Sequence, residues 1–365
     1  MTTESLLDQD WYNGVVAKLG GNEALAESAR QAKAFLRPRT ITSAVDLLRI
    51  VLAYCLSHGG LRSTAAWASA VGLADLSNVA LLQRLRRSAD WLGVLVGQVL
   101  ASHTPKLSQG RLIRIVDGTS VPKAGKTARQ RSQLWRIHSA FDLPDERFGH
   151  FILTDQQEGE KLDFIPVIAG EIRLADRAYM QPDRIAAVLR QGGDVVVRSG
   201  WKSIVWREVG GEPFGLIEAF RKAAGRGPID RAISVERKDG PPLVLRLIAV
   251  EKPPEAAEAA RRQARRAAQR EGYTLSKEAL IAAGWVIIVT SLPADSWSTS
   301  AVLDLYRLRW RIELGFKRLK SLVGLNGPPG ADARSAKAYL LAHLLIILLL
   351  EPVIDEFEDS PHWAD

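Results

Sequence analysis

The chain has few residues that could build a site based on cysteine or histidine. Its 365 residues include one cysteine, Cys55, and six histidines without metal-ligand spacing. A single cysteine excludes a disulfide within the chain and a cysteine-based zinc site. If the protein binds a metal ion, the composition therefore favours a hard cation with oxygen ligands. His138 and His150 are interpreted as structural residues.

A long apolar segment and a secretory leader are also lacking. The most apolar run, residues 338–350, is 13 residues long, which is shorter than the ~20 residues that span a bilayer. The first residues, MTTESLLDQDW, are acidic and contain no apolar run like that of a signal peptide. We therefore expect a cytoplasmic protein without a membrane partner, and a buried helix at residues 338–350.

Basic residues outnumber acidic ones. There are 49 Lys and Arg against 41 Asp and Glu, which gives a formal net charge of +8 and a pI near 9.6. This balance favours a polyanionic partner without requiring one. The 47% hydrophobic and 25% charged residues are typical of a globular protein, and the length allows two or three domains.

Residues 1–108 have helical patterns almost throughout. The strongest predicts an apolar helix at Ile41–Ser57, with Thr40 or Thr42 as its cap. After it, Ser63–Val71 and Ser77–Ser88 predict two helices joined by a glycine-containing turn, and the second of them carries Arg84, Arg86 and Arg87. A DNA-binding helix-turn-helix has this arrangement. A small helical bundle gives the same pattern, so both interpretations stay open.

From residue 109 the apolar pattern changes to that of strands. Apolar runs predict strands at Arg111–Val116, Trp135–Leu143, His150–Asp155, Glu171–Ala175 and Asp194–Arg198, with a helix at Pro182–Arg190. Residues 200–295 resemble an insertion, in which several β segments surround an arginine-rich helix, EAAEAARRQARRAAQREG. These arginines indicate either a solvated helix face or a surface that binds along a phosphate backbone.

A polar stripe follows the segment Asp304–Gly324, DLYRLRWRIELGFKRLKSLVG, which is predicted to be one long helix. At about 100° per residue, four polar side chains fall within roughly a 60° arc beside an apolar stripe that should face a core. They are Tyr306, Arg309, Glu313 and Lys320, with Lys317 close to the same line. One interpretation is an ordinary amphipathic helix whose Glu and Lys are solvated partners four and seven residues apart, and the other is a surface that holds a metal ion and phosphates. Trp310 is expected to pack against the sheet.

Two aspartates follow apolar strands. Asp117 comes after RLIRIV and Asp176 after a second strand, in LADRAY. Taken alone, each is interpreted as a turn former or a helix cap. Together with Glu313 they supply the hard oxygen ligands that one or two Mg²⁺ ions need. Two such ions, about 3.5–4 Å apart, can activate a water or a 3′-hydroxyl and stabilise the leaving oxygen in phosphoryl transfer.

These motifs resemble the DDE transposases of bacterial insertion sequences, and more narrowly the insertion-sequence-4 family. The resemblance rests on DGTS at Asp117, on ADRAY at Asp176 and on the YREK signature, in which two, three and six residues separate Tyr306, Arg309, Glu313 and Lys320. It covers about residues 111–350 and is less secure over the helical N-terminus.

The family implies an α/β fold with a ribonuclease H-like catalytic core, interrupted by a mostly β insertion and preceded by a helical N-terminal domain. The expected domains are a helical N-terminal DNA-binding domain at 1–108, the first part of the core at 109–199, a β-rich insertion at 200–295, the C-terminal core helices with the catalytic Glu at 296–352, and a tail at 353–365.

The family also implies roles for individual residues. The catalytic metal ligands would be Asp117, Asp176 and Glu313, with Mg²⁺ as the cofactor and Mn²⁺ as a substitute. The DNA-binding residues would be Tyr306, Arg309, Lys317, Lys320 and Trp285. Trp285 lies where relatives carry a tryptophan that stacks on a flipped base, which is worth about 1–3 kcal/mol per base. A tryptophan that fills the core of a strand is the alternative.

The expected function is that of a DNA transposase that binds transposon ends, cuts them by metal-dependent phosphoryl transfer and joins the 3′ ends to target DNA. Its partners would be double-stranded DNA, at the nucleoid, and a second copy of the chain in a homodimer on DNA. Two alternatives stay open: a metal-dependent nuclease of the same fold, and an inactive or domesticated DNA-binding protein. Three candidate carboxylates argue against the last, because a protein that only binds DNA does not need them.

Overall fold

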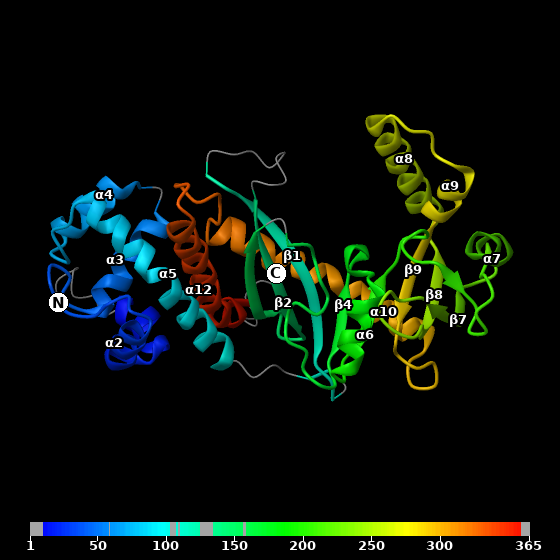
Figure 1. Ribbon diagram of the computed structural model, residues 1–365, viewed down its shortest axis with the longest axis horizontal. Helices are drawn as coiled ribbons and strands as arrows, with labels where there is room; N and C mark the ends of the chain where they lie inside the picture. Colours follow the sequence, from blue (N-terminus) through cyan, green and yellow to red (C-terminus); the bar gives the residue numbers. More distant parts are fainter. Residues whose placement is uncertain are drawn as a thin grey trace.

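The computed structural model describes residues 10–57, 59–102, 107–108, 110–124, 134–155 and 158–358. The fold is mixed α/β, with one large sheet and helices at its sides and at one end (Figure 1). The molecule is elongated: the N-terminal helices lie at one end, and the strands of residues 206–290 lie at the other.

A nine-stranded sheet runs along the molecule in the order β3-β2-β1-β4-β5-β9-β8-β7-β6. Strands β4 and β5 are parallel to β1, whereas the other neighbours pair antiparallel. The strands of the predicted insertion extend this same sheet, because β9 pairs with β5. The strands are β1 (Ile113–Pro122), β2 (Leu134–Leu143), β3 (Arg147–Asp155), β4 (Ile172–Ala175), β5 (Asp194–Arg198), β6 (Trp206–Arg207), β7 (Ile229–Val235), β8 (Leu243–Glu251) and β9 (Trp285–Thr290).

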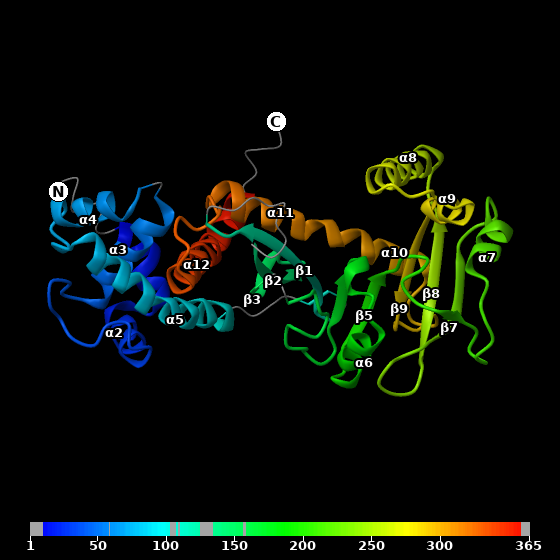
Figure 2. The same ribbon diagram turned by 45° about the horizontal axis from the view of Figure 1, so that its top comes forward.

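Alternation along the strands creates two apolar faces. In β1, Ile113 and Ile115 belong to one hydrophobic core, whereas Val116 belongs to a second core. The first core lies under the helical segment 299–322, and we call this side of the sheet the helix face. The second core lies under the loop 158–170 and α6 (Pro182–Arg190), and we call this side the loop face. Figure 2 shows the two coverings on opposite sides of the sheet.

The helix face is crossed by a continuous helical segment that departs from α-helical winding at two places. It consists of α10 (Thr299–Arg307), the 3₁₀ turn η5 (Leu308–Trp310), α11 (Arg311–Lys317) and the π turn η6 (Arg318–Leu322). The prediction of one long helix at Asp304–Gly324 is therefore confirmed as a continuous segment, but the segment begins at Thr299, ends at Leu322 and is not uniformly wound. A 3₁₀ turn places residues three apart above one another, and π turns occur often at functional sites.

A glycine lets this segment approach the sheet closely. A Cβ atom on Gly315 would lie 2.9 Å from ring atoms of both Phe141 and Phe148. These two rings pack edge to face with centroids 5.1 Å apart, and Phe316 packs on Phe148 from the same helix. Glycine at this position therefore sets the height of α11 above β2 and β3.

The N-terminal helices pack around the apolar C-terminal helix α12. This helix lies against α5 and α3 (Figure 1), and although it passes a length and composition test for a membrane span, most of its apolar window is buried. It runs to Glu358, into the segment predicted as a tail, and residues 359–365 lie outside the described residues. The elements are η1 (Tyr12–Val16), η2 (Ala17–Leu19), α2 (Gly21–Gln31), α3 (Ala44–Leu56), α4 (Leu61–Ala70), α5 (Asn78–Ser102) and α12 (Ala333–Glu358).

Two details of these helices differ from the predictions. Ser43 caps α3, since its hydroxyl accepts from the Asp46 backbone N–H at 3.0 Å, so neither Thr40 nor Thr42 is the cap. Helix α5 continues well past Ser88, because its further turns pack on α12. The remaining helices are η4 (Arg177–Tyr179), α7 (Leu216–Ala223), the arginine-rich α8 (Pro254–Glu271), which projects from the sheet in Figure 1, and α9 (Lys277–Ala283).

Candidate active site

Asp117 lies within β1 and not at its end. The strand continues past it to Pro122 because β2 pairs with it, with Asp117 opposite Ser139. The prediction of a strand end at Asp117 is therefore wrong for β1 itself. The parallel pairing with β4 does stop there, since Val116 opposite Ala175 is its last pair. Asp117 thus stands where one neighbouring strand has ended and leaves room beside it.

Burial and neighbouring charges act on the Asp117 carboxylate, whose side chain is 19% exposed. Burial raises the pKa of Asp117 to about 6. The backbone N–H of Gly118, which donates to Oδ1 at 2.7 Å, acts in the opposite direction and lowers this pKa. The Arg309 guanidinium lowers the pKa, whereas the carboxylates of Asp176 and Glu160 raise it. The charged form of this carboxylate is destabilised by its surroundings, so a cation bound beside it would stabilise that charge.

Asp176 follows β4 directly and caps the 3₁₀ helix η4. Its Oδ1 accepts from the Ala178 backbone N–H at 2.7 Å, so the helix-cap interpretation is correct for one of its two oxygens. Its charge raises the pKa of Asp117 and that of Glu160. The cap fixes the side chain at the end of β4, beside β1, and occupies only part of its acceptor capacity.

Arg309 joins the sheet to the helical segment. Its Nη1 donates to Asp117 Oδ2 at 3.3 Å, and its Nη2 donates to Glu313 Oε1 at 3.4 Å. Burial opposes the charge of this guanidinium, but Tyr306 and the carboxylates of Asp117, Asp176 and Glu313 together raise the pKa of Arg309. The Glu313 side chain is 65% exposed. Two of the three predicted ligands therefore flank one cation.

The remaining residues of the polar stripe lie at different depths. Tyr306 is half-buried beside Arg309, and burial raises the pKa of its hydroxyl. Lys317 and Lys320 are exposed residues, although partial burial lowers the pKa of the Lys320 ammonium. The 3₁₀ turn η5 begins at Leu308 and contains Arg309, so the tighter winding starts just after Tyr306 and brings these two groups together at a spacing of three residues.

The oxygen ligands of this arrangement suit a divalent cation, but the side chains as they lie do not form a metal site. No three His, Cys, Asp or Glu side chains among the described residues stand close enough together to hold a metal ion. The Arg309 guanidinium lies between Asp117 and Glu313 as a stand-in cation. Carboxylate oxygens are the ligands that Mg²⁺ prefers. An exposed Glu313 side chain is free to turn, so the residues present fit a cation that displaces the guanidinium.

Two tryptophans occupy places that the sequence pattern does not decide. Trp285 is 5% exposed and stacks on Phe220, with ring centroids 4.6 Å apart and nearly parallel planes. It fills the core of the loop face, so the core interpretation fits its position and no ring face is open for a base. Trp310, expected to pack against the sheet, is instead 50% exposed and lies beside Arg311. That prediction is wrong, because the 3₁₀ winding of η5 turns this ring outward.

Two further polar side chains lie near Asp117, and the sequence motifs did not predict either of them as a site residue. Glu160 lies in the loop after β3 and pairs with Arg136 at 2.9 Å. The Tyr179 hydroxyl is buried and interacts electrostatically with Asp117, Glu160 and Asp176. Tyr179 is part of the ADRAY motif and could have been found from it. Glu160 carries no sequence signal, because only the folded loop brings it to β1.

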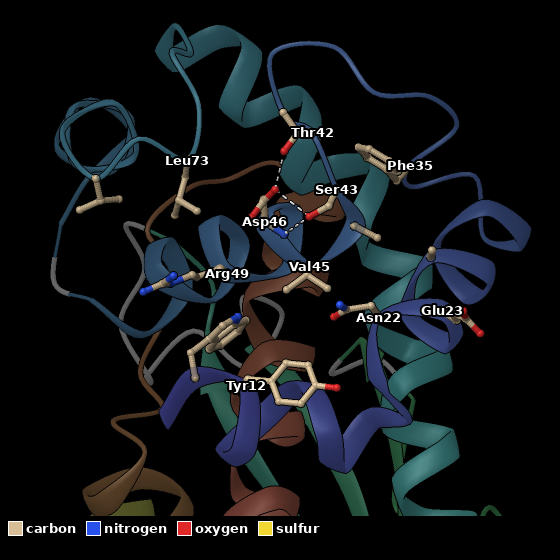
Figure 3. A pocket seen from close by; sticks show the side chains of 14 residues that line it. Tyr12, Asn22, Glu23, Phe35, Thr42, Ser43, Val45, Asp46, Arg49 and Leu73 are labelled. Carbon is tan, nitrogen blue, oxygen red and sulfur yellow. Dashed lines mark hydrogen bonds between the residues drawn. The ribbon is translucent and has the colours of Figure 1, made fainter. Parts of the chain in front are cut away.

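A large pocket lies away from these groups, among the N-terminal helices. It has a volume of about 930 Å³ and is lined by Trp11, Tyr12 and Arg49, among others (Figure 3). The hydroxyls of Thr42 and Ser43 donate to the Asp46 carboxylate at 2.8 and 2.7 Å on its wall. These bonds belong to the start of α3, and the pocket contains none of the predicted site residues.

Comparisons with known proteins agree with the motifs. The family described as "Transposase DDE domain" matches residues 108–349, a range that contains all three predicted carboxylates. The chain is 38% identical over 359 residues to "Putative transposase InsL for insertion sequence element IS186A" of Escherichia coli strain K12, which covers 96% of each chain. It is also 38% identical over 362 residues to "Transposase for insertion sequence element IS421" of Escherichia coli, again over 96% of each chain. The chain therefore belongs to the DDE transposases of bacterial insertion sequences, as its motifs predicted.

Proposed function

We propose that this DNA transposase binds the ends of its insertion sequence, cuts them by metal-dependent phosphoryl transfer and joins the 3′ ends to target DNA. The observation that carries the proposal is the bridge from Arg309 to Asp117 and Glu313, at 3.3 and 3.4 Å. It brings a strand carboxylate and a helix carboxylate to one cation, and Asp176 acts on the same guanidinium.

In this proposal Asp117, Asp176 and Glu313 would hold Mg²⁺, for which Mn²⁺ is a substitute. The bound cation would activate the attacking oxygen and stabilise the leaving oxygen of the phosphodiester. Arg309 then leaves the carboxylates and binds a phosphate of the DNA end, because a guanidinium matches phosphate geometry with two donors. Tyr306, Lys317 and Lys320 lie along the same segment and bind neighbouring phosphates.

The arrangement of the strands supports a ribonuclease H-like core within residues 109–199 and 296–352. Strands β3, β2 and β1 form an antiparallel meander, and β4 and β5 continue parallel to β1 with α6 between them. Asp117 lies on the central strand of this group and Asp176 at the end of its neighbour. Residues 200–295 form the β-rich insertion of the proposed core.

The N-terminal helices are the proposed DNA-binding domain, within residues 1–108. Burial and the nearby charges of Arg87 and Arg39 lower the pKa of Arg84, so these three guanidinium groups form a cationic cluster. A phosphate backbone would relieve their repulsion. Arg86 is not part of this cluster, because it pairs with Asp332 at 3.1 Å. The protein would act on cytoplasmic double-stranded DNA, as a homodimer assembled on the element's ends.

Strand joining by purified protein tests the proposal. The substrate is a duplex that carries a pre-cleaved end of the insertion sequence, with a target plasmid and Mg²⁺. Asp117→Ala and Glu313→Ala should each lower joining by more than about 1,000-fold while DNA binding is retained. Asp304→Ala is the matched control, because Asp304 is an exposed carboxylate on the same helical segment and pairs with Arg307.

Each other outcome points to a different function. Joining that survives in Asp117→Ala or Glu313→Ala would exclude these carboxylates as metal ligands. Cutting without joining by the unaltered chain would indicate a nuclease. Binding with neither reaction would indicate a transposase-derived DNA-binding protein.

A further inference from the structure

Two polar side chains on the loop face lie next to Gly118, the residue that follows Asp117. A Cβ atom on Gly118 would meet Glu160 Oε1 at 3.4 Å and the Tyr179 hydroxyl at 3.7 Å. Both groups therefore lie near the space that a side chain at position 118 would occupy. Electrostatic interactions link Tyr179 to Asp117, Glu160 and Asp176. The Tyr179 hydroxyl therefore lies within electrostatic range of all three carboxylates near the end of β4.

The loop that carries Glu160 is held firmly against the sheet. The buried Arg173 guanidinium, from β4, donates to the carbonyl oxygens of Leu162 and Pro166. From the start of α6, Gln181 Nε2 donates to the Glu160 carbonyl at 2.7 Å. Glu160 thus has a fixed backbone position, set by partners on two sides.

The Tyr179 hydroxyl lacks a partner among these groups. The residue is 1% exposed, and its hydroxyl has no hydrogen-bond partner in the part of the chain that the structure describes. A buried polar group left in this way lowers the stability of the fold. Glu160, by contrast, has its charge offset by Arg136 at 2.9 Å and can still accept further hydrogen bonds. A buried hydroxyl without a partner, within electrostatic range of three carboxylates, indicates a place for a polar ligand.

We propose that Glu160 and Tyr179 are positioning residues that hydrogen-bond the water ligands of the divalent cation held by Asp117 and Asp176. The inference rests on the metal role proposed above. Mg²⁺ keeps several of its waters when it binds a protein, so groups that accept and donate hydrogen bonds are needed around it. The Glu160 carboxylate accepts from such a water, and the Tyr179 hydroxyl donates or accepts. Outer partners of this kind are worth about 10–100-fold in metal affinity.

Binding of Mn²⁺ by the whole chain without DNA tests the inference, with free Mn²⁺ measured by electron paramagnetic resonance. Tyr179→Phe removes only the hydroxyl, and Glu160→Gln removes only the charge. Each should raise the Kd for Mn²⁺ by about 10-fold. Without metal, Tyr179→Phe should leave the Tm unchanged or higher, because the lost hydroxyl has no partner. A merely structural role would lower the Tm and leave the Kd unchanged.

Two further variants separate this inference from the proposed function. Tyr273→Phe, at an exposed tyrosine, is the matched control and should bind Mn²⁺ as the unaltered chain does. If Asp117→Asn loses Mn²⁺ while Tyr179→Phe and Glu160→Gln both keep it, the inference is overturned and the proposed function stands. If Asp117→Asn binds Mn²⁺ unchanged, or the unaltered chain binds none, the metal role itself is overturned, and the inference with it.

Discussion

On the helix face at β1, Arg309 lies between Asp117 and the largely exposed Glu313. On the loop face, one residue further along the strand, Tyr179 lies near Glu160, which belongs to a loop fixed by Arg173 and Gln181. The helix face can therefore rearrange its charges when DNA or a cation arrives. The loop face cannot, because the backbone of the loop that carries Glu160 is fixed by hydrogen bonds and Tyr179 is buried.

This difference indicates a division of labour within the site. A group that must exchange one partner for another needs exposure and weak pairing, since exposed ion pairs are worth roughly 0–1 kcal/mol. A group that orients another needs fixed neighbours. The two tryptophans near these faces follow the same division, with Trp285 buried on the loop face and Trp310 exposed on the helical segment.

The largest expected difference between the faces is in stability. Trp285→Ala removes a ring that stacks on Phe220 and should lower the free energy of unfolding by about 3–5 kcal/mol. Trp310→Ala, its matched control on the helix face, should change it by less than about 0.5 kcal/mol. Chemical denaturation measures both. Equal losses in the two variants would contradict the buried position of Trp285.

Next in size is an effect on activity alone. Arg309→Gln should lower strand joining by roughly 100-fold, because a preorganised charge is lost from the site. The free energy of unfolding should change by less than about 1 kcal/mol, since the two ion pairs are long and one partner is exposed. Arg307→Gln is the control, because the exposed Arg307 pairs only with Asp304 among the described residues. A large loss of stability in Arg309→Gln would show that the bridge is structural.

The height of the helical segment above the sheet gives a third prediction. Gly315→Ala should lower the free energy of unfolding by about 1–3 kcal/mol, because its Cβ would overlap Phe141 and Phe148. Joining should fall as well, since the shift moves Glu313 away from Asp117. Gly97→Ala in α5 is the control: its Cβ meets nothing within 4 Å, and alanine favours a helix. Unchanged stability in Gly315→Ala would show that α11 lies further from the sheet.

The smallest expected effect is a pH dependence on the loop face. Burial lowers the pKa of His138 to about 4, with help from Arg136, against about 6.5 in an unfolded chain. Below pH 6.5 the unfolded chain takes up a proton that the folded one refuses, so His138 lowers stability as the pH falls toward 4. Between pH 7 and pH 5.5, His138 alone should lower the free energy of unfolding by about 1 kcal/mol. His138→Gln should remove this loss, as denaturation at the two pH values measures. The same pH slope in both proteins would contradict it.

Much of the secondary structure could be predicted locally. The strands β2 to β5 and the helix α6 fall close to the bounds that apolar runs and a helix-starting proline predict. The helical segment with the polar stripe was also predicted, because its apolar positions repeat at helical spacing over many residues. The end of β1 was not, because its pairing with β2 decides where it stops. When a partner that is distant in the sequence sets the length of a strand, the local apolar pattern does not show where that strand ends.

What the sequence by itself determined is the chemistry and the family: three carboxylates in recognisable motifs, the YREK spacing and the apolar periods of sheet and helix. Only the tertiary structure decided which groups meet. It placed Arg309 between Asp117 and Glu313, buried Trp285, exposed Trp310, and brought Glu160 to Gly118. The physical reason is that these contacts join segments far apart in the chain, so they depend on how the sheet, the loop and the helical segment pack together and not on any residue's near neighbours.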